Sequence, residues 1–179
     1  MIVLASASPR RRLLLEAAGV SVHVVRPSVD ETWRGEEPVA FAERLAWAKA
    51  TAVEGGVVIA ADTVVHREGC LFDKPADPQA ATDTLASLSG QWHRVTTAFV
   101  VRSATSVVAQ AIHTEVRFRC LPDAEIEAYI RTGEPFDKAG AYGIQGAGGA
   151  LVAELRGSYN NVVGLPLEEV LDALRRVTR

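Results

Sequence analysis

The chain has 179 residues, of which 48% are hydrophobic, so it can bury a core and has the usual size of one domain. Its formal net charge is only -3, so it lacks the broad cationic surface that holds polymeric nucleic acid. No apolar run approaches the length of a membrane span, and the two cysteines, Cys70 and Cys120, form no metal-binding or disulfide pattern. We therefore expect a single cytoplasmic domain over residues 1–179 that binds neither membranes nor nucleic acid polymers.

The first half of the chain predicts two strands, each followed by a helix, and then a buried strand. Ser8 and Pro9 suit the N-cap and the first position of a helix, and Gly19 suits its end. The expected elements are strands over 2–5 and 20–25, helices over 9–18 and 39–53, a continuous apolar strand over 57–61 that ends at Asp62, and a hairpin turn over 67–69.

The second half predicts helices interleaved with strands that short turns connect. The expected elements are helices over 77–90, 122–131 and 166–177, strands over 95–101, 107–118 and 151–155, and a glycine-rich loop over 140–149. Because helices alternate with strands while some strands form hairpins, the pattern favours an α/β fold with a mixed sheet.

Three consecutive arginines, Arg10 to Arg12, fall in the first turn of the first predicted helix. The positive end of the helix dipole disfavours cations there, so a bound anion is one explanation for their presence. Free backbone N–H groups, the hydroxyls of Ser6 and Ser8, and the guanidinium groups would together form a phosphate site. The alternative is that these arginines lie on a solvated face of the helix.

Asp62 stands between two apolar segments in VVIAADTVV, where a carboxylate needs a metal ion, a cation or a hydrogen-bond donor. Ligands in open α/β sheets bind at the carboxyl ends of strands, which makes Asp62 a candidate functional acid. Glu31, in the acidic VDE segment, is a candidate second carboxylate. The alternative for Asp62 is a structural role, in which backbone donors or an arginine satisfy it.

The segment EPFDKAGAYGIQGAGG combines glycines with the polar side chains of Asp137, Lys138, Tyr142 and Gln145. Glycines allow the backbone to approach a ligand closely, although the segment matches neither a P-loop nor a dinucleotide-binding fingerprint. Only three of the 19 basic residues are lysines, namely Lys49, Lys74 and Lys138. In an arginine-rich chain they are candidates for positions that require a compact ammonium group, unless the bias is accidental.

Six segments together resemble the Maf family, whose members are also called septum formation proteins. They are LASASPRRRLLLEAAG, ADTVV, DKP, SGQWHRVTTA, EPFDKAGAYGIQGAGG and GSYNNVVGLPL, and they occur in order from residue 2 to about residue 171. The resemblance implies an α/β fold similar to that of inosine triphosphate pyrophosphatases, with an elongated mixed sheet, flanking helices and two lobes around a cleft. It also implies a nucleoside triphosphate pyrophosphatase that depends on a divalent metal ion, Mg²⁺ or Mn²⁺, and that is often a homodimer.

The resemblance and the residue chemistry together give a set of expected site residues. Asp62 is the expected catalytic acid, and Glu31 and Asp62 would hold the metal ion. Phosphate groups would be bound by Ser8, Arg10, Arg11, Lys49 and Lys74. Specificity would depend on Arg10, Thr63, Lys138, Tyr142 and Gln145.

The form DKAGAYGIQG resembles the subgroup of the family that acts on dTTP and UTP, sometimes with modified pyrimidine nucleotides. Two alternatives remain at this point. One is the sister subgroup that hydrolyses 7-methyl-GTP. The other is a nucleotide-binding regulator of septum formation with weak turnover.

Overall fold

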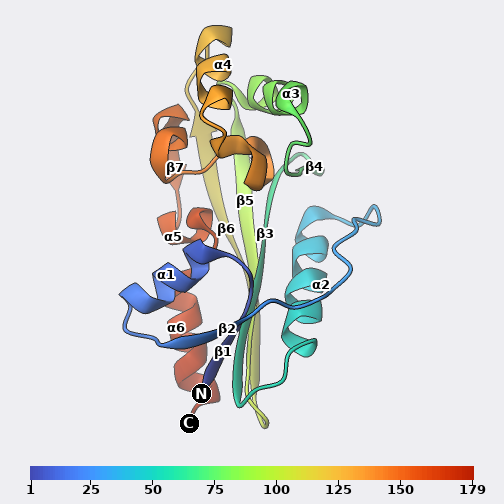
Figure 1. Cartoon of the computed structure of the whole chain (residues 1–179), viewed down its shortest axis with the longest axis vertical. Coiled ribbons are helices and arrows are strands. Elements are labelled where there is room, and N and C mark those ends of the chain that lie inside the picture. Colours follow the sequence, from blue (N-terminus) through green and yellow to red (C-terminus); the bar gives the residue numbers. More distant parts are fainter.

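A seven-stranded mixed sheet runs the length of the computed structural model, which describes residues 1–179 (Figure 1). The strands are β1 Ile2–Ala5, β2 Val22–Val25, β3 Val57–Arg67, β4 Cys70–Phe72, β5 Trp92–Arg102, β6 Val107–Phe118 and β7 Val152–Arg156. Their order is β2-β1-β3-β5-β6-β7, with β4 paired to β3. Since β1 is parallel to β2 and β3 while the other pairs are antiparallel, the expected mixed sheet is confirmed.

Helices cover the sheet on both faces and at one end. The α-helices are α1 Pro9–Ala17, α2 Pro38–Thr51, α3 Pro78–Leu88, α4 Asp123–Arg131, α5 Tyr159–Val163 and α6 Leu167–Val177, and the 3-10 segments are η1 Glu134–Asp137, η2 Ala139–Ala141 and η3 Gly146–Leu151. None of these helices combines the length and the apolar character that crossing a membrane would require.

The alternation of side chains along β3 assigns one helix layer to each face of the sheet. Val58, Ala60 and Val64 pack in one cluster with α2, while Ile59 and Ala61 pack in another with α1 and α6. Figure 1 shows α2 on one side of the long strands and α1 and α6 on the other. We call this half of the molecule, which includes β1 and β2, the basal lobe.

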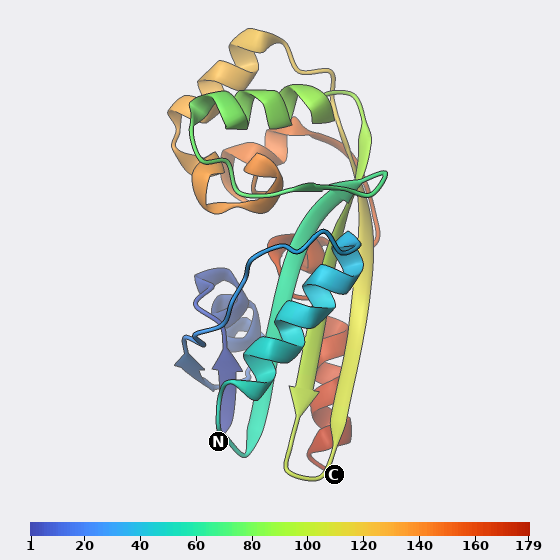
Figure 2. The same ribbon diagram turned by 90° about the vertical axis from the view of Figure 1, so that its right-hand side faces the viewer.

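A second group of elements lies at the other end of the long strands (Figure 2). Here α3, α4 and the three 3-10 segments pack around a third cluster that includes Leu85, Phe118, Tyr129 and Tyr142. We call this group, together with β7, the apical lobe. Because β3, β5 and β6 extend into both lobes, the sheet sets the position of one lobe relative to the other.

The predicted end of the strand at Asp62 is wrong, because β3 continues to Arg67. Antiparallel pairing with β5 is unbroken from Val58 to His66 and carries the strand past the carboxylate. On the opposite edge, pairing with β1 stops at Ala60, and pairing with β4 begins at Val65. Asp62 therefore lies just beyond the carboxyl end of the parallel part of the sheet, within a strand and not after it.

Two further expectations need correction. The glycine-rich loop over 140–149 contains parts of η2 and η3 and is not wholly irregular. The short helix α5, whose N-cap is Ser158, was not expected from the sequence. The other predicted helices and strands are present, with boundaries that differ by a few residues.

Candidate active site

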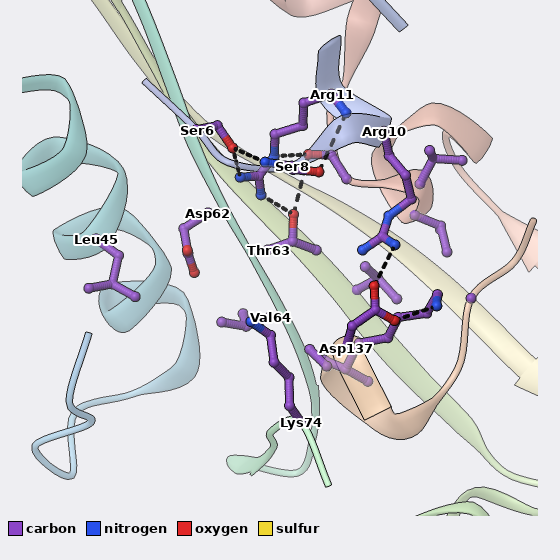
Figure 3. Close-up of a pocket in the computed structure, with 18 of the residues that line it drawn as sticks. Ser6, Ser8, Arg10, Arg11, Leu45, Asp62, Thr63, Val64, Lys74 and Asp137 are labelled. Carbon is purple, nitrogen blue, oxygen red and sulfur yellow. Dashed lines mark hydrogen bonds and ion pairs between the residues drawn. The ribbon is translucent and has the colours of Figure 1, made fainter. Parts of the chain in front are cut away.

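A cavity of about 640 Å³ opens between the basal and apical lobes (Figure 3). Every residue predicted for the site lines it: Ser8, Arg10, Arg11, Glu31, Lys49, Asp62, Thr63, Lys74, Lys138, Tyr142 and Gln145. The lining has six lysine or arginine side chains and four carboxylates, an excess of two positive charges in a chain of net charge -3. The cavity is therefore a local cationic site on an acidic protein, which suits a small polyanion.

The two arginines that begin α1 have different environments. Ser8 caps the helix through its hydroxyl, which accepts a hydrogen bond from the backbone N–H of Arg11. The side chain of Arg10 is 33% exposed and extends across the cavity, where its Nη1 lies 3.4 Å from Oδ2 of Asp137 on the apical lobe (Figure 3). Arg11 is only 7% exposed. The alternative in which these arginines lie on a solvated face is therefore wrong for Arg11, which is buried.

The guanidinium group of Arg11 connects α1 with three other segments of the chain, which contain Ser6, the middle of β3 and Gly164. Nε donates to the carbonyl of Gly164 at 2.7 Å, and Nη1 donates to the Ala61 carbonyl at 2.8 Å and to Ser6 Oγ at 3.0 Å. Nη2 donates to Thr63 Oγ1 at 3.0 Å. On this edge of β3, pairing with β1 ends at Ala60 and pairing with β4 begins only at Val65. The Ala61 carbonyl lies in this gap, and Arg11 supplies the hydrogen-bond donor that a neighbouring strand would otherwise provide.

Lys49 connects the two candidate carboxylates. Its Nζ lies 2.6 Å from Oδ1 of Asp62 and 2.9 Å from Oε1 of Glu31. The helix α2 brings Lys49 to the face of β3 on which Asp62 points, whereas Glu31 comes from the segment before α2. Lys49 and Asp62 are buried, while half of the Glu31 side chain is exposed.

The two carboxyl groups differ in proton affinity. Burial raises the pKa of Asp62 above its ordinary value, against the opposing charges of Lys49 and Arg11. Partial burial also acts to raise the pKa of Glu31, but the hydrogen bond and charge of Lys49 outweigh it, so this pKa lies below its ordinary value. Asp62 is thus the more basic of the two and the better proton acceptor.

The apical lobe brings a second set of polar groups to the cavity. Nζ of Lys138 donates to the Glu134 carbonyl at 2.7 Å and to Oδ1 of Asp137 at 2.6 Å. Gln145 is exposed at the cavity. The hydroxyl of Tyr142 is 2.8 Å from Nε2 of His93 in the interior. A hydrogen bond from this hydroxyl to a ligand would therefore have to form in addition to its contact with His93.

The remaining predicted residues lie at the base and at the edge. Oγ1 of Thr63 accepts from Arg11 and lies 2.9 Å from Oγ1 of Thr97, so it is held within the sheet. Lys74 follows β4, is exposed, and extends toward the cavity in Figure 3. Its charge also acts to lower the pKa of Glu31 across the site.

Two supporting residues were not assigned a role from the sequence. Asn161 is buried in α5, and its Nδ2 donates to the carbonyls of Val95 and Ile112, which ties α5 to the sheet. Glu134 accepts hydrogen bonds from the backbone of the glycine-rich loop. Their only sequence signal is their presence in the segments GSYNNVVGLPL and EPFDKAGAYGIQGAGG.

The fold and the cavity define an α/β protein whose cationic cleft, capped helix N-terminus and buried acid are suited to a phosphorylated small molecule. The chain belongs to the Maf-like protein family, whose pattern matches residues 1–177.

Three similar proteins align with nearly the whole chain. It is 50% identical over 181 residues to the dTTP/UTP pyrophosphatase of Citrifermentans bemidjiense, an alignment that covers 97% of this chain and 94% of that protein. It is 51% identical over 180 residues to the dTTP/UTP pyrophosphatase of Anaeromyxobacter dehalogenans strain 2CP-1, with 98% and 93% covered. The dTTP/UTP pyrophosphatase of Chromobacterium violaceum is 44% identical over 178 residues, with 94% and 90% covered.

Proposed function

We propose that this protein is a nucleoside triphosphate pyrophosphatase that hydrolyses dTTP and UTP to the nucleoside monophosphate and pyrophosphate. The observation that carries the proposal is that Asp62, a buried carboxyl group whose pKa is raised, lines a cavity with a net positive charge. The names of relatives at about half sequence identity support the reaction and the substrates.

The triphosphate would lie along the N-terminus of α1. Arg10 and Lys74 at the cavity edge would neutralise its charge, and the backbone N–H of Arg10 in the first turn of α1 would be a further donor. Asp62 would accept the proton of a water molecule as that water attacks the α-phosphorus. The bond between the α-phosphorus and the bridging oxygen then breaks, and the cations stabilise the negative charge on the departing pyrophosphate.

The oxygen donors of the site fit a hard divalent cation such as Mg²⁺ or Mn²⁺. Asp62 and Glu31 come from two segments, and the ammonium group of Lys49 contacts only one oxygen of each, so that the second oxygen of each carboxylate remains available for the ion. Mg²⁺ commonly uses one or two carboxylates together with water and substrate phosphates, so a third protein ligand is not required. Such an ion, when bound, would polarise the phosphate oxygens and lower the pKa of bound water.

Base recognition is assigned to the apical lobe. Gln145 is exposed at the cavity, and its amide can both donate to and accept from the edge of a pyrimidine. Lys138, which lines the same cavity, is held by Glu134 and Asp137. We further propose a single catalytic domain, a homodimeric state and a cytoplasmic location, the last supported by two exposed, unpaired cysteines.

The test is pyrophosphate release from a panel of dTTP, UTP, CTP, ATP, GTP and 7-methyl-GTP, with Mg²⁺ or Mn²⁺ supplied. We expect the highest kcat/KM for dTTP and UTP. A preference for 7-methyl-GTP would instead select the activity of the sister subgroup. Saturable binding of nucleotide without release of pyrophosphate would refute the enzyme and favour a nucleotide-binding regulator.

A further inference from the structure

Gln145 stands at the tip of a tightly closed turn of the apical lobe. The residues on either side of the turn are in close contact, because a Cβ atom added to Gly149 would lie only 2.6 Å from the carbonyl oxygen of Ile144. Ile144 itself is buried, whereas Gln145 is exposed. The backbone around the proposed base-reading residue is thus fixed by its neighbours, while its side chain remains free for a ligand.

The carboxylate of Glu134 binds the residues of this turn that follow Gln145. Oε2 accepts a hydrogen bond from the backbone N–H of Ala147 at 3.1 Å, and Oε1 accepts one from Gly148 at 3.1 Å. The hydroxyl of Tyr129, which α4 carries, donates to Oε1 at 3.0 Å. One carboxylate therefore fixes two successive peptide groups that follow Gln145 and links them to α4.

Tyr129 also binds the part of the turn that precedes Gln145. Its hydroxyl oxygen accepts a hydrogen bond from the backbone N–H of Gly143 at 3.2 Å. Tyr129 is buried, and burial together with the nearby charge of Glu134 raises the pKa of its hydroxyl, so the hydroxyl remains a donor. Tyr129 and Glu134 thus form one chain of hydrogen bonds from Gly143 to Gly148, across the turn that carries Gln145.

The glycines of the turn fit this arrangement closely. A Cβ at Gly146 would lie 2.9 Å from Oε2 of Glu134, and one at Gly148 would lie 2.6 Å from the hydroxyl of Tyr129. Gly146 also has a φ of 76°, in the left-handed region that favours glycine. The glycines are therefore required for Glu134 and Tyr129 to approach the backbone, in addition to any approach by a ligand.

We infer that Glu134 and Tyr129 are positioning residues that fix Gln145 for discrimination between nucleobases. The inference rests on the proposed function, since it assigns base reading to Gln145. Neither residue is required to touch the substrate. Loss of either one would leave the phosphate-binding residues and Asp62 in place, but would let the tip of the turn shift against the base.

The experiment compares Glu134→Gln and Tyr129→Phe with wild type and with Glu127→Gln. Glu127 pairs only with Arg131 on the exposed side of α4, so it is the matched control. For each protein, kcat and KM are measured for UTP, dTTP, CTP and GTP by pyrophosphate release, and thermal denaturation confirms folding. We expect the ratio of kcat/KM for UTP to that for GTP to fall about tenfold in both variants, the equivalent of one hydrogen bond.

The double variants with Gln145→Ala separate positioning from a general structural effect. Because Glu134 is inferred to act through Gln145, Glu134→Gln should cause no further loss of discrimination once Gln145 is replaced. Tyr129→Phe provides the same comparison if Glu134→Gln does not fold. Loss of discrimination that adds fully to that of Gln145→Ala would overturn the inference, as would an unchanged substrate ratio in the single variants.

The two proposals fail in different ways. Wild-type protein that releases no pyrophosphate from any nucleotide would refute the proposed function. Wild-type protein that discriminates between nucleotides through Gln145, and still discriminates equally well in Tyr129→Phe and Glu134→Gln, would refute only the positioning role.

Discussion

Adjacent arginines at the start of α1 should respond to the same substitution in opposite ways. Replacing Arg11 with methionine keeps much of the side-chain volume but removes all four of its hydrogen bonds. The same replacement at Arg10 removes one partly exposed ion pair with Asp137. We expect Arg11→Met to lower stability strongly and Arg10→Met to lower activity with little change in stability.

The size of the effect follows from the acceptors that Arg11 leaves behind. Ser6 Oγ and Thr63 Oγ1 keep other partners, Ser8 and Thr97 respectively. The Ala61 carbonyl loses its charged donor, at about 1–3 kcal/mol for a buried group left unsatisfied, and the Gly164 carbonyl keeps only the longer contact of 3.4 Å with Thr63 Oγ1. We therefore expect a loss of roughly 3 kcal/mol, which lowers Tm by about 6–12 °C in a domain of this size.

Thermal and urea denaturation of both variants measure this difference, and pyrophosphate release from UTP and dTTP measures activity. An exposed ion pair contributes about 0–1 kcal/mol, so Arg10→Met should keep its Tm within about 4 °C of wild type. Its kcat/KM should fall at least about tenfold for all nucleotides, as loss of a phosphate contact predicts. Equal losses of Tm in the two variants, or a wild-type Tm in Arg11→Met, would refute the structural role of Arg11.

Three further predictions concern ionisable groups of the site and its support. Asp62→Asn should reduce kcat/KM at least about a hundredfold in the presence of metal ion, because the amide cannot accept the proton of the attacking water; near-normal turnover of the variant would contradict this role. Burial lowers the pKa of His93 to about 4, so between pH 6.5 and 4 the unfolded chain binds more protons than the folded protein. The free energy of unfolding should therefore fall by about 3 kcal/mol as the pH is lowered from 6.5 to 4, and His93→Gln should show a smaller fall. Lys49→Arg should lose on the order of a hundredfold in kcat/KM, because a planar head cannot occupy the point between two carboxylates; full activity would contradict this reason.

Most of the fold was predictable because its elements have periodic apolar patterns and clear end signals. Pro9, Pro38 and Pro78 each stand at the first position of a helix, as Pro favours. The end of β3 was not predictable, because an acid inside an apolar run is normally typical of the end of a strand. Only the pairing of Asp62 with Ala98 on β5 explains why the strand continues.

The membership of the site was more predictable than the contacts within it. The unusual positions of Asp62, the arginines and the lysines indicated functional chemistry, and all of these residues except Arg12 line one cavity. The sequence does not distinguish Arg10 from Arg11, because their difference depends on where β1 ends relative to β3. The bridge from Lys49 to Asp62 likewise depends on how α2 packs on the sheet.

The distribution of charge explains how one cavity can hold both a buried acid and a polyanion. In the deeper part, the cations Arg11 and Lys49 balance the carboxylates Asp62 and Glu31, so no net charge has to be desolvated there. The excess positive charge lies nearer the edge, where Asp137 already accepts hydrogen bonds from Arg10 and Lys138. A triphosphate that binds Arg10 therefore replaces one anion by a more highly charged one. A monophosphate carries less charge with which to compete against Asp137, so we expect the product to bind more weakly than the substrate.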